Sequence, residues 1–216
     1  MSKIIVLNNV VDSVIKGEIE ACKETVTKAL EMGLDPLEII EEGLTRGIKE
    51  VGDRFRIGEY FLYDLAIGGE AMMAGMEILE PIMLIQKKKM KRLGRVLIGT
   101  VAGDVHDIGK NIVGIMLTAH GFEVIDLGTD VKDEVFISKI KELKPDILGL
   151  SALLTHTMQK QRDVINALKK SGFRDKVKVM VGGGAVNEEW AQEIGADAYG
   201  VDALETVSKA KKLLIK

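Results

Sequence analysis

Apolar positions in the first part of the chain recur every three to four residues, which predicts amphipathic helices. One stripe covers residues 17–32. Asp35 and Pro36 then predict the start of a second helix, with Asp35 as N-cap and Pro36 at the first helical position. A third pattern covers residues 61–83. If residues 10–15 supply a short first helix, these segments pack as a four-helix bundle.

From Arg95 onward the period changes to short runs rich in β-branched residues, separated by segments of helix length. The expected strands are 96–101, 122–127, 147–150, 177–181 and a weaker 198–201, and the expected helices are 110–119, 132–143, 159–170, 188–194 and 204–214. This alternation predicts an α/β, flavodoxin-like (Rossmann-like) doubly wound domain with a five-stranded parallel sheet. Ligands of such sheets bind beyond the carboxyl ends of the strands.

Composition narrows the function classes. The 216 residues are 46% hydrophobic and 29% charged, as expected of a folded chain. No apolar run approaches the ~20 residues that cross a bilayer, and the start lacks a signal-peptide pattern, so we expect a cytoplasmic protein without a membrane partner. Cys22, the single cysteine, cannot form an internal disulfide. Aromatic residues at 4% and a net charge of −3 argue against nucleic acid as a partner.

Charge is distributed unevenly along the chain. Residues 1–86 carry 8 basic and 16 acidic residues, whereas residues 87–216 carry 22 and 17. The segment 87–92, KKKMKR, is favoured as a solvated connector over a nucleic-acid-binding arm, because nothing aromatic accompanies it. We therefore expect a helical bundle at 1–86, a basic linker at 87–94 and the α/β domain at 95–216.

Three polar loops follow the predicted strands. Residues 103–109, GDVHDIG, follow the first strand, residues 151–157, SALLTHT, follow the third, and residues 182–184, GGG, follow the fourth. These loops lie side by side in a doubly wound sheet, so glycines, hydroxyls and a histidine converge on one edge. A ligand with a bulky flat body and a polar tail suits this edge.

Among the residues of these loops, the side chain of His106 most clearly indicates a chemical role. Neutral imidazole ligates transition metals, and a nearby carboxylate can accept its other ring N–H and fix its tautomer. Asp104 is placed to do so, although His106 alone could also be an ordinary hydrogen-bonded residue. Asp104 and Asp107 could instead cap the following helix. We favour capping for Asp107 and the hydrogen bond to His106 for Asp104.

The glycines and hydroxyls of the other two loops also allow two interpretations. Residues 182–184 could form a tight turn, but close approach of a ligand is the more economical explanation of three glycines in succession. Ser151, Thr155 and Thr157 could cap a helix that begins near Met158, or they could offer hydroxyls to the ligand.

The motifs in these loops resemble a known signature. D-x-H-x-x-G at 104–109, 41 intervening residues, S-x-L at 151–153, 28 intervening residues and G-G at 182–183 resemble the cobalamin-binding signature of corrinoid proteins and of methionine synthase. In the first half GDRF at 52–55, GEYFL at 58–62 and LEP at 79–81 are similar to the family's helical cap. No catalytic barrel accompanies these motifs. The resemblance is therefore to the free-standing corrinoid subunit of anaerobic methyltransferase systems that use methylamines, methanol or similar donors.

The resemblance implies a function and a cofactor. Cobalamin would bind base-off, with His106 in place of the cofactor's dimethylbenzimidazole as lower axial ligand of cobalt. The protein would carry a methyl group on cobalt from a substrate-specific methyltransferase to an acceptor methyltransferase, and a reductive activator is a further expected partner. Such a subunit of one-carbon metabolism is not expected to be catalytic alone.

The resemblance also implies roles for individual residues. Asp104 would hold His106, and the hydroxyl of Thr157 would complete the relay. Phe61, Leu62 and Met72 are candidates to cover the upper face of the cofactor, although a methionine stripe is by default core. The nucleotide tail would occupy a slot, and the expected cofactor-binding residues are Gly103, Asp104, Val105, His106, Asp107, Ile108, Gly109, Ser151, Leu153, Thr155, Thr157, Gly182, Gly183 and Ala203.

Two positions depart from the family pattern. Tyr63 stands where proline commonly follows Phe-Leu, which affects the start of the helix in the cap. His156 stands where a small hydroxyl residue is frequent, and we favour a solvent-facing side chain over a contact with the ligand.

Three other function classes remain as alternatives. A nicotinamide-dependent oxidoreductase requires G-x-G-x-x-G, and the middle glycine is missing from the loop at 103–109. A receiver-type signalling domain has no use for the tail-slot glycines or the helical half. A cobalamin-dependent sensor or regulator is the strongest rival, but the 16 residues before the first long helix are too few for a DNA-binding domain.

Overall fold

The structure, a computed structural model, describes residues 2–85 and 92–215. The described residues form two compact units, one on each side of the gap at 86–91. Among these residues, no helix is both long and apolar enough to span a membrane. Of the predicted linker at 87–94, residues 87–91 lie outside the described part of the chain.

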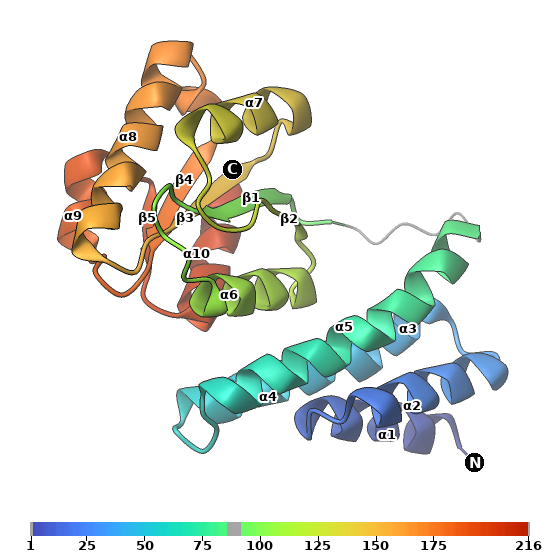
Figure 1. The fold of residues 1–216 in the computed structure, drawn as a ribbon. Coiled ribbons are helices and arrows are strands. Elements are labelled where there is room, and N and C mark those ends of the chain that lie inside the picture. Colours follow the sequence, from blue (N-terminus) through green and yellow to red (C-terminus); the bar gives the residue numbers. More distant parts are fainter. Residues whose placement is uncertain (1, 86–91, 216) are drawn as a thin grey trace. The chain divides into compact units, whose positions relative to one another are not determined.

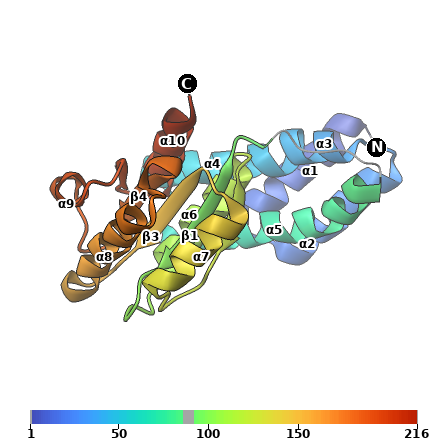
Figure 2. The ribbon, with the colours of Figure 1, turned by 90° about the horizontal axis from the view of Figure 1, so that it is seen from above.

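The first unit is helical. Its elements are α1 (Lys3–Ile15), α2 (Ile19–Glu31), α3 (Pro36–Ile39), the π-helix η1 (Ile40–Thr45), α4 (Arg46–Arg56) and α5 (Leu62–Ile85). Because α3, η1 and α4 follow one another without a break, they act as one long helix. Four helical stretches therefore lie alongside one another (Figure 2), with α1 and α5 each packed against α2 and α4. The predicted four-helix bundle is confirmed.

The start of the bundle differs from the expectation, whereas its second helix begins as predicted. Helix α1 begins at Lys3 rather than near Val10, because the buried stripe continues upstream through Val6 and Leu7. At the second start, the Asp35 carboxylate accepts a hydrogen bond from the Leu37 backbone N–H at 2.9 Å, and the proline at the next position has no N–H that would need an acceptor.

The π-helical stretch η1 lies where the long helix meets α1. A side-chain Cβ at Gly43 would lie 2.9 Å from Val10, and one at Gly47 would lie 2.7 Å from Val14. Since ordinary Cβ contacts are wider, glycine at these two positions lets the helices approach closely. The apolar spacing predicts one regular helix here, so the wider turn of a π-helix was not predicted.

The second unit contains one parallel sheet. Its strands are β1 (Arg95–Thr100), β2 (Glu123–Asp126), β3 (Ile147–Ser151), β4 (Lys178–Gly182) and β5 (Ala198–Gly200), in the order β2-β1-β3-β4-β5. All neighbouring strands are parallel. This is the doubly wound order of flavodoxin-like folds, so the predicted fold class is confirmed.

Helices cover both faces of this sheet. They are α6 (Ile108–Ala119), α7 (Asp133–Leu143), α8 (Thr155–Ser171), α9 (Glu188–Ile194) and α10 (Ala203–Leu214), with a short 3-10 turn η2 (Arg174–Lys176). Figure 1 shows α7 and α8 on one side of the sheet and α6 and α10 on the other. Leu97, Leu148 and Val179 of three adjacent strands pack in one buried cluster with Phe136 of α7 and Val164 of α8. Burial on both faces explains why these strands read as continuous apolar runs.

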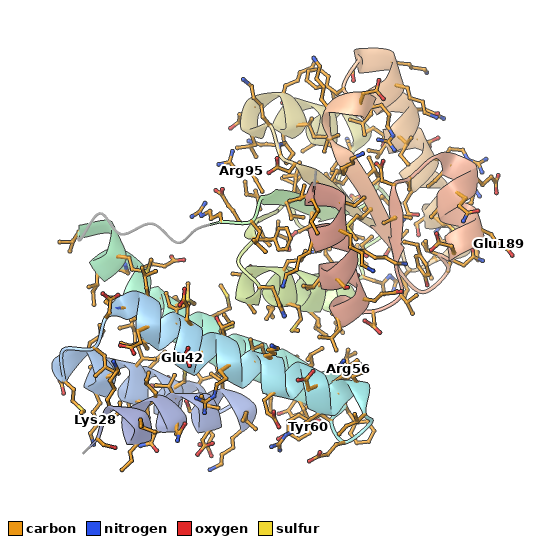
Figure 3. All side chains as sticks on the ribbon, turned by 180° about the vertical axis from the view of Figure 1, so that it is seen from behind. Lys28, Glu42, Arg56, Tyr60, Arg95 and Glu189 are labelled. Atoms are coloured by element: carbon orange, nitrogen blue, oxygen red, sulfur yellow. The ribbon has the colours of Figure 1, made fainter. Side chains whose placement is uncertain are left out.

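The residues that precede the sheet are anchored to its edge. Arg92 pairs with Glu123 at 2.6 Å, and the Leu93 N–H donates to the Gly121 carbonyl at 2.9 Å. Arg95, labelled in Figure 3 at the start of β1, donates from Nε to Glu123 and from Nη1 to the Leu143 carbonyl. These arginines hold the pKa of the Glu123 carboxyl below its usual range.

Candidate functional site

Four strands end level with one another and so define the edge of the candidate site. In the parallel register Thr100 pairs with Ser151, Ser151 with Gly182, and Gly182 with Gly200. The loops after β1, β3 and β4 therefore begin side by side, as the sequence predicted. Neighbours in this row are 51, 31 and 18 positions apart in the chain.

The first loop brings Asp104 and His106 together. The His106 Nδ1 atom lies 2.7 Å from Oδ1 of Asp104, and the His106 backbone N–H donates to the same oxygen at 3.1 Å. Asp104 is 1% exposed, whereas the His106 side chain is 48% exposed. The ring is thus held at Nδ1 from the protein side, which leaves Nε2 as the nitrogen available to a ligand.

The second loop completes the environment of Asp104. Its Oδ2 accepts hydrogen bonds from the Thr157 hydroxyl at 2.6 Å and from the Leu153 backbone N–H at 2.8 Å. Burial alone would raise the pKa of this carboxyl, but the bonds from Thr157, His106 and Leu153 outweigh burial and hold the pKa well below its usual range. Asp104 is therefore an ionised, buried acceptor that joins the β1–α6 loop to the β3–α8 loop.

Asp107 does not do what its position predicts. It stands at the N-cap of α6, but its side chain makes no capping bond and instead accepts from Nδ2 of Asn111 at 3.2 Å. Its backbone φ of −129° and ψ of −14° depart from the extended conformation that points an N-cap carboxylate at the first amides. The expected capping role of Asp107 is wrong.

One glycine of the third loop is required by the fold itself. Gly183 has φ +125°, and a Cβ there would lie 1.9 Å from the Ala152 carbonyl oxygen. A Cβ at Gly184 would lie 2.8 Å from the Leu153 side chain. At Gly183, therefore, a close backbone approach within the protein explains the glycine without any ligand.

Gly109 is a glycine of the opposite kind. It is exposed in the first turn of α6, its φ is not positive, and a Cβ there would meet nothing within 4 Å. The fold leaves room for a side chain at this position, so the absence of one suits a ligand that lies against the start of the helix.

The other predicted residues lie around the same edge. Thr155 is the exposed first residue of α8, and Ala203 is the buried first residue of α10, directly after the N-cap Asp202. Leu153 and Val105 are 42% and 69% exposed apolar side chains, and Ile108 is 66% exposed. The site thus offers a histidine set among apolar side chains, which is a surface for a flat, largely apolar ligand. His156 is exposed, in agreement with the expectation.

The candidates in the helical unit divide into two groups. Phe61 is 72% exposed and Leu62 is 49% exposed, at the start of α5. Figure 3 marks the same end of the bundle with Arg56 and Tyr60, between α4 and α5. Met72, by contrast, is 2% exposed and belongs to the core of the bundle. As a candidate to cover a cofactor Met72 is therefore wrong, because a side chain inside the bundle cannot reach an external ligand.

The sequence alone did not identify several residues that position the site. The buried Thr100 hydroxyl donates to the His106 carbonyl at 3.0 Å, and the Gly103 N–H donates to Oδ1 of Asp130 at 2.7 Å. Gln161, fully buried on α8, donates to the Leu150 and Gly182 carbonyls. Polar residues at the ends of β1 and β2 were a usable signal for Thr100 and Asp130, since the rule about strand ends applies to them as well.

Comparison with known proteins places the chain in a family. A family model described as "B12 binding domain" matches residues 94–208, and a second model of the same description matches residues 6–80. The chain is 50% identical over 200 residues to trimethylamine corrinoid protein 2 of Methanosarcina acetivorans, covering 93% of this chain and 92% of the relative. The chain belongs to the B12-binding corrinoid proteins.

Two further similarities extend over nearly the whole chain. Dimethylamine corrinoid protein of Methanosarcina barkeri is 47% identical over 217 residues, covering 99% of this chain and 100% of the relative. A chain in the crystal structure of the methanol:cobalamin methyltransferase complex MtaBC from Methanosarcina barkeri aligns with a TM-score of 0.86 at 31% identity, covering 97% of this chain and 80% of that chain. The similarity thus covers both the helical unit and the sheet of this corrinoid protein.

The buried bond from Thr157 to Asp104 has a measurable consequence. We expect Thr157→Val to lower the free energy of unfolding by about 2 kcal/mol at pH 7, since a hydrogen bond to a charged group is lost. Thr157→Ser keeps the hydroxyl and is the matched control, expected within about 1 kcal/mol of the wild type. Urea unfolding of the apoprotein measures both.

The same pair of variants gives the sign of the pH dependence. The folded pKa of Asp104 lies below its unfolded value of about 3.9, so its stabilisation is present above that pH and is lost as pH falls through the folded pKa. In Thr157→Val the folded pKa rises, so the variant takes up the proton first. The difference between wild type and variant should therefore shrink below about pH 4, and a difference that stays constant with pH contradicts this role of Asp104.

Gly183 and Gly109 form a second matched pair. Gly183→Ala should cost about 3 kcal/mol or more of folding free energy, because its Cβ collides with backbone at a positive φ. Gly109→Ala should leave apoprotein stability unchanged or raise it by up to about 1 kcal/mol, yet weaken hydroxocobalamin binding. Thermal unfolding and titration by visible absorbance measure the two effects. Wild-type cobalamin affinity in Gly109→Ala would remove Gly109 from the cofactor-binding residues.

Proposed function

We propose that this corrinoid protein binds cobalamin base-off, with His106 as the lower axial ligand of cobalt, and serves as a methyl carrier. The observation that carries the proposal is the Nδ1 hydrogen bond of His106 to a buried, ionised Asp104, with the remainder of the ring exposed at the carboxyl edge of the sheet. Bound cobalamin supplies a cobalt that accepts a methyl group from one methyltransferase and releases it to another. The protein supplies binding, orientation and electrostatics.

The residues present fit the cofactor. Imidazole nitrogen is a suitable ligand for a transition metal, and a carboxylate on the other ring nitrogen raises its basicity. The exposed apolar side chains of Val105 and Ile108 flank His106 in sequence and suit the face of a macrocycle. Gly109 leaves open a space that a Cβ would fill.

The proton on Nδ1 is the one that the protein controls. Since the carboxyl of Asp104 stays ionised, it accepts this proton as a hydrogen bond and leaves the lone pair of Nε2 free to ligate. The Thr157 hydroxyl and the Leu153 N–H hold the other carboxylate oxygen, so Asp104 cannot rotate away from His106. Asp104 and Thr157 thus set the tautomer and direction of the ligand.

The row of small residues at the strand ends is the proposed place of the nucleotide tail. Ser151 and Gly182 are neighbours across β3 and β4, Gly200 continues the row on β5, and Gly183 directly follows β4 in the chain. The proposal rests on the motif resemblance, because the protein's own atoms in Ala152 and Thr206 already take the space that a Cβ would need at Gly183 and Gly200. Gly103, Leu153, Thr155 and Ala203 complete the proposed lining.

The helical unit is the proposed cap, with a basic linker at 87–94 between it and the α/β domain. Phe61 and Leu62 are the side chains proposed to cover the upper face of the cofactor, because they are apolar and exposed at the start of α5. This assignment draws on the motif resemblance and on the family model that matches residues 6–80.

Methyltransferases are the partners of this protein. Relatives are named trimethylamine and dimethylamine corrinoid proteins, and a structural neighbour is a chain of a methanol:cobalamin methyltransferase complex. We propose in addition an acceptor methyltransferase and a reductive activator, since a carrier requires a release step and its reduced state requires maintenance. The cytoplasm is the proposed location.

Replacement of the proposed ligand tests the binding mode. His106→Ala should still retain hydroxocobalamin after desalting, because the tail slot is intact, but it should lose the nitrogen splitting in the electron paramagnetic resonance spectrum of the reduced, Co(II) form. His156→Ala is the matched control, since it removes an exposed histidine from the neighbouring loop and should keep the wild-type spectrum. Wild-type splitting in His106→Ala would remove the ligation from the proposal.

Retention and transfer test the carrier role. Apoprotein incubated with excess hydroxocobalamin and then desalted should remain coloured at about one cofactor per chain. The loaded, reduced protein should accept methyl groups from a methylamine or methanol methyltransferase. A change in its visible absorbance measures this transfer. A protein that stays colourless, or that accepts methyl groups from none of these enzymes, contradicts the proposed function.

A further inference from the structure

Asp130, in the loop between β2 and α7, makes contacts that the proposed function does not use. It is one of two residues other than glycine with a positive φ in the described part of the chain, and the other, Lys144, is the C-cap of α7. A left-handed backbone at such a residue persists when surrounding bonds fix it. Aspartate tolerates it better than most side chains.

Two bonds connect Asp130 to the loop that carries His106. Its carboxylate Oδ1 accepts the Gly103 N–H at 2.7 Å, and its own N–H donates to the Asp104 carbonyl at 2.9 Å. Gly103 itself has φ +80°. One residue therefore clamps the backbone N–H of Gly103 and the backbone carbonyl of Asp104, just before His106 in the chain.

The clamp completes the backbone bonding of Asp104. The Asp104 N–H donates to the Val101 carbonyl at 3.1 Å, and its carbonyl accepts from Asp130, so the peptide groups on both sides of its Cα are fixed. Its side chain then meets His106 with one oxygen and Thr157 with the other. A rotation of this backbone would break both side-chain contacts together.

The side chain of Asp130 contributes little else to the fold. Its residue is exposed, and the segment it belongs to is tied to β1 independently, because the Thr100 N–H donates to the Gly128 carbonyl and the Val131 N–H donates to the Thr100 carbonyl. A bridge between Val101 and Val131 extends this pairing. Loss of the carboxylate should therefore leave the sheet intact and release Gly103.

We infer that Asp130 is a positioning residue for the His106 ligand and acts by clamping Gly103 and Asp104. The inference rests on the proposed function, in which His106 ligates cobalt. The clamp sets the direction of His106 through Asp104, without a bond between Asp130 and His106. It adds the β2–α7 loop to the loops after β1, β3 and β4 that define the site.

Two variants of the full chain separate the bond from the charge. Asp130→Ala removes the acceptor, whereas Asp130→Asn keeps an acceptor oxygen and tolerates the left-handed backbone. In apoprotein, the amide of Gly103 should exchange its hydrogen about fivefold faster in Asp130→Ala, the factor that corresponds to a bond of about 1 kcal/mol. Asp130→Asn should stay within about twofold of the wild type.

The same variants loaded with hydroxocobalamin and reduced to Co(II) give the decisive measurement. The ratio of His-ligated to unligated cobalt, read from the nitrogen splitting, should fall about fivefold in Asp130→Ala and be restored in Asp130→Asn, with equal cofactor retention after desalting. An unchanged ratio in Asp130→Ala overturns the inference and leaves the proposed function standing. Equal losses in both variants also overturn it, since charge and not the clamp would then be responsible.

Two other outcomes are distinguishable. If the wild type itself shows no nitrogen splitting, the proposed function fails, and the inference falls with it. If Asp130→Ala speeds exchange at core amides such as Leu148 as well as at Gly103, Asp130 supports the whole fold, and its assignment as a positioning residue is overturned.

Discussion

A buried carboxylate with four hydrogen-bond donors holds the candidate site together. Asp104 is nearly inaccessible to solvent, and an ionised carboxylate in that position would be costly without donors. Its partners come from the β1–α6 loop, at His106, from the β3–α8 loop, at Leu153, and from the first turn of α8, at Thr157. Because both oxygens are engaged, the charge that orients the histidine also fastens two loops to each other. The chemistry of the site and the geometry of the loops therefore share one cause.

Donors from separate segments can reach the Asp104 carboxylate only because the strands end in register. Thr100, Ser151 and Gly182 are neighbours across β1, β3 and β4, so the loops leave the sheet at the same height. Gln161 on α8 bonds the carbonyls of Leu150 and Gly182, and its Oε1 accepts the Trp190 indole N–H at 3.0 Å. A buried side-chain amide thus fixes the ends of two strands against helices α8 and α9. The rigid strands fix the positions of the loops, and the loops hold the residues of the candidate site.

Local patterns predicted most of this architecture, and their limits have physical reasons. Strand and helix types in the α/β unit followed from the switch of apolar period, and the capping bond of Asp35 followed from its place before Pro36. The π-helix at Ile40–Thr45 was not visible, because apolar spacing does not distinguish a widened turn from a regular one. The early start of α1 was missed although the stripe continued through Val6.

Within the site, side-chain types were predicted better than side-chain directions. His106, Asp104 and Thr157 meet as the motif implies, since both loops leave neighbouring strands. Asp107 failed because capping depends on backbone angles that residue type does not fix. Asp130 lies just beyond the end of β2, where the strand-end rule could have singled it out, but its two bonds are with backbone groups, and side-chain spacing does not predict those partners.

The glycines show how fold and ligand can be told apart at one site. Gly183 and Gly109 belong to the same proposed set, yet a Cβ at the first would collide with the protein's own backbone and a Cβ at the second would meet empty space. A glycine that the polypeptide requires says little about what binds beside it. A glycine that the polypeptide does not require, in a helix where alanine is more favourable, calls for an external cause. Gly109 lies three residues after His106, in the first turn of α6, and of these two glycines it is the one at which the fold leaves room for something other than the protein.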